Sequence, residues 1–157
     1  MARTGSGELS AEGTPQPGCK FCDVLAGATE GWIVLEDEHT MAFLDHRPLF
    51  PGHSLLVPRD HYDTLPDLPE KILTELFLNA QVLARAMEVG LGAEGSFVAI
   101  NNRVSQSVPH LHVHVVPRTR GDGLRGFFWP RQKYRDEDHV KETRQAIREA
   151  VAELRRP

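Results

Sequence analysis

The chain alternates hydrophobic and polar positions over several short stretches, and this two-residue period is typical of β-strands with one buried face. Turn-forming residues separate them, for example Pro51 and Gly52 ahead of the third stretch. Strands that follow one another this closely pair most simply as antiparallel neighbours. The predicted strands cover residues 32–38, 40–45, 53–58, 95–102 and 110–117.

Two further stretches place apolar residues at three- and four-residue steps, which predicts amphipathic helices. The first begins at a D-x-x-E capping box, Asp67 to Glu70, and Gly90 and Gly92 are its expected stop signals. Its apolar stripe comprises Leu73, Leu76, Ala80, Leu83 and Met87. The second covers residues 138–155 and carries a stripe of Val140, Ile147, Val151 and Leu154. Grouped strands and helices predict an α+β fold, with an antiparallel sheet of about five strands, a central helix and a C-terminal helix.

Composition and charge restrict the number of domains that the chain can form and the classes of partner that it can bind. Its 157 residues suit a single domain over 19–157, and residues 1–18, rich in Gly, Ser, Glu and Pro, are expected to be a disordered tail. A formal net charge of −4 argues against nonspecific binding to nucleic acid or anionic membranes, and no apolar run approaches ~20 residues. The N-terminus lacks an apolar signal segment, which favours a cytoplasmic protein with reduced or metal-bound cysteines.

Three of the eight histidines lie within five residues of the last predicted strand, at His110, His112 and His114. Because residues i, i+2 and i+4 of a strand share one face, the three imidazoles point the same way. The opposite face would enter the core with Leu111, Val113 and Val115. A single histidine is most often structural, but three in register indicate a metal site, a catalytic site or both.

The residues alone leave two chemical interpretations of this strand. In the first, all three histidines bind one zinc ion that keeps an open position for water. In the second, they divide the work and at least one is a nucleophile, since a neutral imidazole with a pKa near ~6.5 is reactive around neutral pH. A nucleophilic ring needs an acceptor for its Nδ1 proton, so that Nε2 presents its lone pair.

Two blocks, "LDHRPLFPGHSLLVPRDHY" at 44–62 and "NNRVSQSVPHLHVHVVPR" at 101–118, together resemble the histidine triad superfamily of nucleotide hydrolases and transferases. The resemblance runs from about Cys19 to Arg118. It implies that His112 attacks the α-phosphorus of a nucleotide and forms a covalent nucleotidyl-histidine intermediate, which water then hydrolyses. It also implies that His114, Ser107 and Gln106 contact the phosphate or the leaving group.

The resemblance assigns the nucleoside side of the site as well. Asp45 matches the carboxylate that takes the two ribose hydroxyls, although alone it would be interpreted as a turn residue ahead of His46-Arg47-Pro48. His53 matches a histidine that supports the triad from the neighbouring strand, and Asn101 matches a further family position. Many relatives have glycine where this chain has Ser105, whose side chain either narrows the phosphate pocket, alters the φ angles of the loop, or is harmless in a β-region conformation.

The segment "CKFC" places Cys19 and Cys22 in a C-x-x-C spacing at the start of the predicted domain. Two thiolates are half of a tetrahedral zinc site, and His61 and His110 are candidates for the other half. The resemblance implies this Cys-Cys-His-His set, because many relatives share it. A closed four-ligand site is structural and would leave His112 free of metal. The alternative is a reduced C-x-x-C pair without metal.

Aromatic and basic residues alternate in "GLRGFFWPRQKY" at 123–134, which predicts an anchor for the last helix or a nucleotide contact. Because related proteins are often two-fold dimers, Trp129 is a candidate to approach the partner's site. We therefore expect a homodimeric hydrolase of a purine nucleoside phosphoramidate or a dinucleoside polyphosphate, with structural zinc. The alternatives are a nucleotidyltransferase or phosphorylase, and a nucleotide-binding regulatory protein with little turnover.

Overall fold

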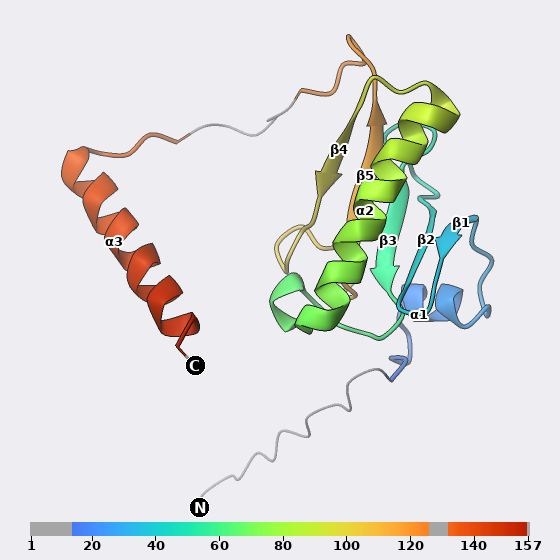
Figure 1. Cartoon of the computed structure of the whole chain (residues 1–157), viewed down its shortest axis with the longest axis horizontal. Helices are drawn as coiled ribbons and strands as arrows, with labels where there is room; N and C mark the ends of the chain where they lie inside the picture. Colours follow the sequence, from blue (N-terminus) through green and yellow to red (C-terminus); the bar gives the residue numbers. More distant parts are fainter. Residues whose placement is uncertain (1–13, 126–131, 157) are drawn as a thin grey trace, which may run out of the picture. The chain divides into compact units, whose positions relative to one another are not determined.

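The computed structural model describes residues 14–125 and 132–156, and the chain divides into two compact units, Met1–Asp122 and Gly123–Pro157 (Figure 1). The second unit contains one helix, α3 (Glu137–Leu154), close to the predicted 138–155. The first unit holds all the other elements. They are α1 (Lys20–Leu25), β1 (Ile33–Glu36), β2 (Thr40–Leu44), β3 (Ser54–Pro58), the 3₁₀ helix η1 (Leu65–Asp67), α2 (Glu70–Leu91), β4 (Gly95–Ala99) and β5 (Val113–Arg118).

The five strands form one sheet in the order β1-β2-β3-β5-β4, and every neighbouring pair is antiparallel. The predicted α+β fold is therefore confirmed. β5 lies between β3 and β4, and its register places His114 opposite Leu55 on one side and Ala99 on the other. This central position brings the histidine-rich segment beside residues of β3 that precede it by more than a third of the chain.

β2 and β3 alternate their side chains between two cores, one on each face of the sheet, and a different helix packs against each core. α2 lies across one face, as Figure 1 shows. There its buried stripe packs against Ala42, Leu56, Leu111, Val113 and Val115. On the other face the core combines Cys19, Phe21, Cys22, Met41, Phe43, Leu55 and Val57. His112 and His114 alternate with Val113 and Val115, so they belong to the face on which Phe21 of α1 packs.

The predicted start of the helix α2 needs correction. Asp67 does not cap α2: its carboxylate accepts hydrogen bonds from the backbone N–H and hydroxyl of Thr64 and closes a capping box on η1 instead. α2 starts one residue after Pro69, whose fixed φ suits the entrance to a helix. Its buried stripe begins at Ile72, while Leu73 is half-buried. Gly92 ends it in the left-handed conformation, as predicted.

Two other elements differ from the prediction. α1 was not predicted, because its six residues are too few to form a helix without tertiary support. That support comes from burial of Phe21 and Cys22. β5 starts at Val113 rather than at His110, so His110 and His112 lie just ahead of the regular ladder.

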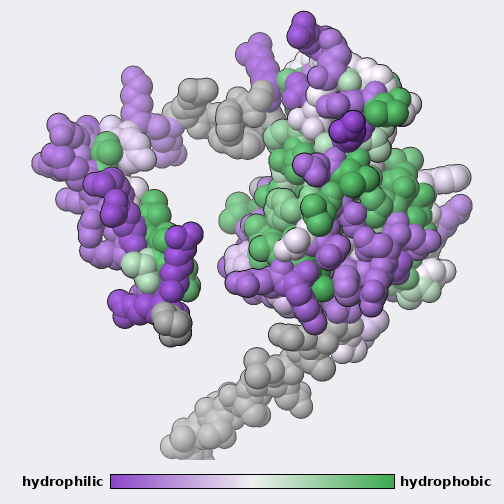
Figure 2. Space-filling view, viewed as in Figure 1, coloured by the Kyte–Doolittle hydropathy of each residue, from purple (hydrophilic) through white to green (hydrophobic). Residues whose placement is uncertain are grey.

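α2 also exposes apolar side chains on the face that points away from the sheet. Figure 2 shows hydrophobic residues gathered over this helix. They include Phe77, Leu78, Val82 and Val89, each at least 44% exposed. β4 forms one edge of the sheet, and its Val98 is exposed as well. Among the described helices, none combines the length and apolarity that a membrane span requires.

Gly52, in the turn before β3, is the first of two positions whose replacement would test a restricted backbone conformation. Its φ is 102°, a value that side-chain-bearing residues rarely adopt. A Cβ atom there would lie 2.5 Å from Leu91 Cδ1 and 3.3 Å from Pro117 Cγ. The turn therefore needs glycine for its dihedral angle, and an added Cβ atom would also crowd the side chains of Leu91 and Pro117.

Replacing Gly52 with alanine should lower the free energy of unfolding by about 1–3 kcal/mol, because the variant combines a strained φ with a steric clash. Urea denaturation would measure the change. Gly95→Ala is the matched control, since Gly95 has ordinary φ and no atom within 4 Å of its Cβ position. Equal stabilities of the two variants would contradict this account.

Ser105 is the second such position, with a φ of 61° in the loop between β4 and β5; Arg103 in the same loop has 65°. This φ excludes the β-region conformation, one of the alternatives weighed for Ser105. Ser105→Gly should raise the free energy of unfolding by about 0.5–1 kcal/mol through relief of this strain. Ser105→Ala keeps the strain and should give no gain in the same urea titration, so equal gains in both variants would count against the strain.

Candidate functional site

Two cavities lie on either side of the loop that connects β4 to β5. The first, which we call the histidine cavity, has a volume of about 630 Å³, and its walls include Phe21, Asp45, Ser107, His112 and His114. The second, the Gln106 cavity, has about 550 Å³ and is described below. Four of the predicted site residues thus share the histidine cavity.

Hydrogen bonding fixes the tautomer of His112. Its Nδ1 lies 2.7 Å from the backbone oxygen of His110. A carbonyl oxygen only accepts hydrogen bonds, so Nδ1 must carry the proton. In the neutral ring Nε2 then holds the lone pair, and the side chain lines the cavity. This is the arrangement that a nucleophilic imidazole requires.

His114 has the opposite tautomer, because a chain of donors reaches it from the loop before β3. The backbone N–H of Leu49 donates to Nδ1 of His53 at 3.1 Å, so this nitrogen carries no proton. His53 therefore has its proton on Nε2 and donates it to Nδ1 of His114 at 3.0 Å. Nε2–H of His114 is left as a donor. Two histidines that line the same cavity thus offer one lone pair and one proton.

These tautomers require neutral rings, and the environment favours them. Burial lowers the pKa of His112 and of His53 below the ordinary value of 6.5, since the charged ring loses its hydration. Burial, assisted by the neighbouring His112 and His53, lowers the pKa of His114 to about 4. At neutral pH the cavity therefore holds the neutral imidazoles of His112 and His114, with the half-buried carboxylate of Asp45 in the same lining.

The carboxylate of Asp45 stabilises the turn that follows β2 and also lines the histidine cavity. Its Oδ1 accepts the backbone N–H of Arg47 at 2.9 Å, which is the local role expected of a turn-forming aspartate. Its Oδ2 lies 3.8 Å from Nδ1 of His53, too far for a hydrogen bond, so this oxygen is available to donors from a ligand. The turn interpretation and the binding interpretation are therefore compatible.

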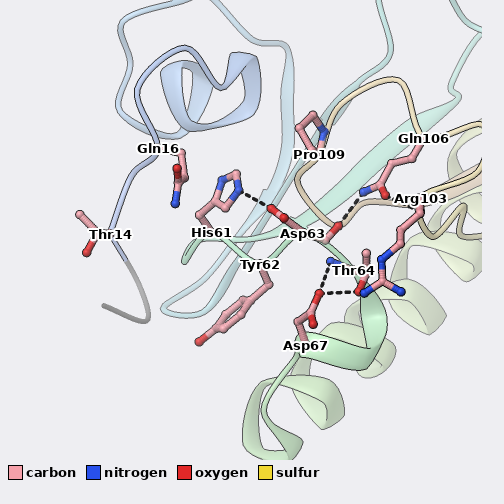
Figure 3. Close-up of a pocket in the computed structure, with 10 residues that line it drawn as sticks. All are labelled: Thr14, Gln16, His61, Tyr62, Asp63, Thr64, Asp67, Arg103, Gln106 and Pro109. Atoms are coloured by element: carbon pink, nitrogen blue, oxygen red, sulfur yellow. Dashed lines mark hydrogen bonds and ion pairs between the residues drawn. The ribbon is translucent and has the colours of Figure 1, made fainter. Parts of the chain in front are cut away.

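Gln106 and Asn101 are not among the residues that line the histidine cavity. Gln106 points into the other cavity, where its amide donates to the backbone oxygen of Asp63 at 2.6 Å (Figure 3). Its Oε1 accepts the backbone N–H of Arg103 at 2.7 Å. Asn101 donates to the backbone oxygen of Ser105 at 3.3 Å and holds the loop. Their predicted contacts with substrate remain predictions.

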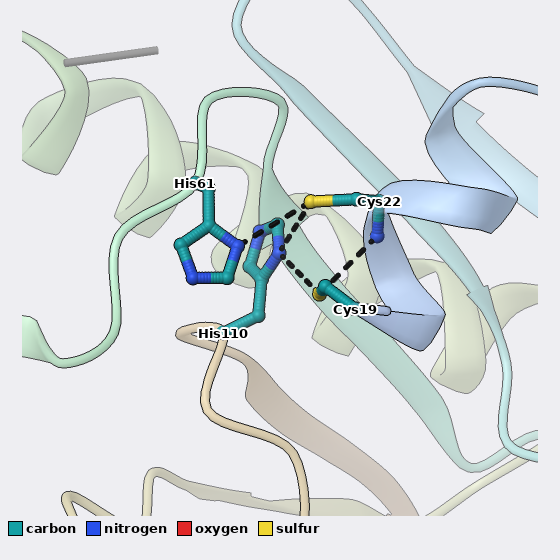
Figure 4. A group of neighbouring side chains, drawn as sticks. All are labelled: Cys19, Cys22, His61 and His110. Carbon is teal, nitrogen blue, oxygen red and sulfur yellow. Dashed lines mark hydrogen bonds between the residues drawn. The ribbon is translucent and has the colours of Figure 1, made fainter. Parts of the chain in front are cut away.

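The four predicted metal ligands come together in a second cluster, which we call the Cys/His cluster. It comprises Cys19, Cys22, His61 and His110, whose ligand atoms all lie within 4.8 Å of one another (Figure 4). Nδ1 of His110 is 3.5 Å from Sγ of Cys19 and 3.6 Å from Sγ of Cys22. Nδ1 of His61 is 3.3 Å from Sγ of Cys22.

The donor set of the Cys/His cluster fits a tetrahedral metal ion. Bonds of ~2.3 Å to sulfur and ~2.05 Å to nitrogen at tetrahedral angles separate S from N by about 3.6 Å, close to the distances observed. Nε2 of His110 faces the backbone oxygen of Pro58, and Nε2 of His61 faces the carboxylate of Asp63, both at 2.9 Å. Each Nε2 therefore carries the proton, and each Nδ1 turns its lone pair toward the thiols.

Backbone N–H groups also point at both sulfur atoms. Cys19, the N-cap of α1, accepts from the N–H of Cys22, and Cys22 accepts from the N–H of Gln16, each at 3.4 Å. Such donors stabilise thiolate ligands. Without metal, burial raises the pKa of the Cys22 thiol, so binding of a metal ion would displace a proton from it.

The sequence did not reveal one residue of the site, Phe21. It lies between the two cysteines, and its ring meets the ring of His112 edge-on at a centroid distance of 5.1 Å. The signal was its apolar character inside the C-x-x-C segment, because of the two residues between the cysteines Phe21 is buried and Lys20 is exposed. Trp129, the candidate for a contact with a partner, lies outside the described residues.

Comparison with known proteins agrees with these features. The HIT domain family matches residues 27–121. An uncharacterized HIT-like protein of Methanocaldococcus jannaschii is 37% identical over 107 residues, 67% of this chain and 82% of that protein. Adenosine 5'-monophosphoramidase HNT1 of Saccharomyces cerevisiae is 30% identical and covers 80% of this chain and 78% of its own length. Adenylylsulfatase HINT3 of Arabidopsis thaliana is 29% identical, and the match covers 77% of this chain and 62% of that protein.

Solved structures show the same fold. A protein of Streptococcus mutans superposes with a TM-score of 0.78 at 29% identity, covering 88% of both chains. A zinc-bound histidine triad family protein of Mycobacterium smegmatis gives a TM-score of 0.66 at 33% identity, covering 86% of this chain and 96% of that one. The fold, the cavity lined by His112 and His114 and the extent of these similarities lead to one assignment: the chain belongs to the histidine triad (HIT) family.

Proposed function

We propose that the protein is a nucleotide hydrolase that cleaves at the α-phosphate of a purine nucleoside phosphoramidate or dinucleoside polyphosphate through a nucleotidyl-histidine intermediate. The observation that carries this proposal is the pair of opposite tautomers in the histidine cavity. Nε2 of His112 offers a lone pair to the phosphorus, and Nε2–H of His114 offers a hydrogen bond to its oxygens. The two groups together suit attack on a phosphoryl centre.

In the first step, Nε2 of His112 forms a bond to the α-phosphorus, and the bond from phosphorus to the leaving group breaks. The leaving group departs with the electron pair of that bond and takes up a proton. His112 keeps its Nδ1 proton and becomes positively charged, and the carbonyl of His110 stabilises this charge. Ser107 and His114 line the same cavity and would donate to the nonbridging oxygens.

In the second step, water attacks the phosphorus and the bond from phosphorus to nitrogen breaks. The electron pair of that bond returns to Nε2, the attacking water loses a proton, and the nucleoside monophosphate leaves. The free oxygen of Asp45 would hold the ribose hydroxyls during both steps. His53 would keep its partner His114 in the donor tautomer.

Relatives favour an adenosine nucleotide as the substrate class, since two of them are named as an adenosine 5'-monophosphoramidase and an adenylylsulfatase. A phosphorylase would use the same intermediate, with phosphate in place of water in the second step. A binding protein with little turnover would use the same cavity without the covalent step.

We further propose that zinc is bound by Cys19, Cys22, His61 and His110. The support comes from the S₂N₂ donor set, the proton-bearing Nε2 atoms and the zinc-bound structural relative. Four protein ligands leave no open position, so the metal would contribute stability to the fold. With these four ligands, His112 binds no metal. This choice therefore disfavours the alternative in which His110, His112 and His114 together bind one zinc ion. Free thiols beside histidine ligands suit the reducing cytoplasm, which we retain as the proposed compartment.

We also retain the homodimer as a proposal. β4 is an edge strand with the exposed Val98, and α2 exposes Phe77, Leu78 and Val82 on the outside of the same unit. An unpaired edge and an apolar helix face are surfaces that a second copy would cover.

Replacing His112 with alanine should lower kcat for an adenosine phosphoramidate by at least about a thousandfold, because the variant lacks the Nε2 lone pair that His112 presents to the cavity. Release of adenosine monophosphate would be followed with the phosphoramidate and with a diadenosine polyphosphate, each with and without added phosphate. Formation of adenosine diphosphate only with phosphate would identify a phosphorylase.

His39→Ala is the matched control for this experiment, because His39 is half-buried and lines neither cavity. It should retain full turnover. Unchanged activity of His112→Ala would overturn the covalent mechanism. Nucleotide binding without any product from the unmodified protein would leave the binding function in its place.

Elemental analysis of the purified protein should find about one zinc ion per chain, which the Cys19→Ser/Cys22→Ser double variant loses. Because metal binding contributes directly to folding, the double variant should also unfold at lower urea concentration, at a cost of several kcal/mol (roughly 3 or more). His139→Ala, on α3, should keep both the metal and the stability. Equal zinc content in the double variant would exclude these ligands.

A further inference from the structure

His110 belongs to both centres of the protein through different atoms. Nδ1 of its ring faces the two thiols of the Cys/His cluster, and its Nε2–H donates to the backbone oxygen of Pro58. Its own backbone oxygen holds the Nδ1 proton of His112. Its side chain is fully buried and lines neither the histidine cavity nor the Gln106 cavity. One residue therefore connects the metal ligands to the nucleophile without reaching a substrate.

The sheet does not hold the carbonyl of His110 in place. β5 begins at Val113, three residues later, and its ladder to β3 begins with the pair Leu56 and Val113. Backbone bonds near this carbonyl are the N–H of His110 to the oxygen of Val108 and the N–H of Leu111 to the oxygen of Tyr62. The N–H of Leu111 belongs to the same peptide unit as this carbonyl, and its acceptor Tyr62 directly follows the ligand His61. The direction of the carbonyl thus depends on two members of the Cys/His cluster, the ring of His110 and the backbone that follows His61.

A second contact runs from the same cluster to the same ring. α1 is held at its start by Cys19 and Cys22, and Phe21 between them packs on the rings of His112 and His110 at 5.1 and 5.9 Å. The Cys/His cluster therefore controls both the hydrogen bond at one edge of the nucleophile and an apolar wall beside it. A small displacement of α1 or of His110 changes where Nε2 of His112 points.

We propose that His110 is a positioning residue through which metal occupancy of the Cys/His cluster sets the rate of attack by His112. This inference rests on the proposed function of His112 and assigns the cluster a second role besides stability. Because neither His61 nor His110 lines the histidine cavity, loss of the metal acts mainly on kcat. A displacement of about 1 Å in a reacting group costs about a hundredfold in rate, so the expected loss in kcat is about 10- to 100-fold.

The test uses His61, the ligand that contacts His110 but not His112. His61→Ala removes a metal ligand, and His61→Cys restores a four-donor set. Zinc content, circular dichroism, kcat, KM and the dissociation constant for adenosine monophosphate would be measured on both full-length variants. We expect His61→Ala to lose its zinc and to turn over about 10- to 100-fold more slowly, with nucleotide affinity within about threefold of the unmodified protein. His61→Cys should recover both zinc and kcat.

A spectroscopic measurement reports on His112 independently of turnover. Long-range proton–nitrogen NMR correlations distinguish the Nδ1–H from the Nε2–H tautomer of each histidine. In the zinc-loaded protein His112 should be of the Nδ1–H form, and in zinc-free His61→Ala this form should be lost or exchange with the other tautomer. A folded, zinc-free variant with unchanged kcat and an unchanged His112 signal would overturn the coupling.

If His61→Ala does not fold, Asp63→Ala provides the same test. It removes the acceptor of the His61 Nε2–H but keeps all four ligands and the backbone oxygen that binds Gln106. Loss of such a partner weakens metal affinity by about 10- to 100-fold, so zinc can be titrated into the variant. kcat and the His112 signal should rise together with occupancy, and a kcat independent of occupancy would contradict the proposal.

The two proposals fail in different ways. If His112→Ala retains full turnover, the proposed function fails, while the NMR response of His112 to zinc still decides the coupling. If turnover depends on His112 but neither kcat nor the tautomer responds to zinc, the coupling alone fails.

Discussion

The hydrogen bond from Nδ1 of His112 to the backbone oxygen of His110 is the interaction on which the chemistry of the site depends. A carbonyl oxygen cannot donate, so this contact alone fixes the proton on one nitrogen and the lone pair on the other. The same rule applies to Nε2 of His110, which faces the oxygen of Pro58. Backbone oxygens therefore decide which ring nitrogen of His110 and of His112 carries the proton.

Strand periodicity explains how three histidines serve different purposes at short range. His112 and His114 are neighbours on the face of the sheet that α1 covers, with ring centroids 4.9 Å apart. The partners behind them differ, because His112 is held by its own backbone and His114 by His53 from the turn before β3. His110 leaves the regular ladder and turns its ring toward the cysteines. One segment thus gives three imidazoles three different environments.

Much of the fold could be predicted from the sequence, since five strands and two helices have the periodicity of partly buried elements. Helix ends were less accessible: Asp67 caps η1 because the nearby Thr64 supplies the reciprocal donors, a competition that spacing alone does not reveal. α1 carried no periodic signal, because six residues depend on packing for their helical state.

The site was predictable as a set of residues but not as a set of interactions. The resemblance to a family identified Ser107 and His112, which line one cavity. It did not predict that Gln106 donates to the backbone oxygen of Asp63, because this contact depends on the loop between β4 and β5, in which two residues are left-handed.

The Cys/His cluster joins parts of the chain that are synthesised at different times. Cys19 precedes its partner His110 by 91 residues, and Cys22 precedes His61 by 39. Contacts this distant in sequence form late in folding, since the loops between them must close first. A growing chain that has not yet reached β5 has two cysteines without His110 and a cavity without its imidazoles. The reactive histidine therefore appears only together with the residues that orient it, once the sheet is complete.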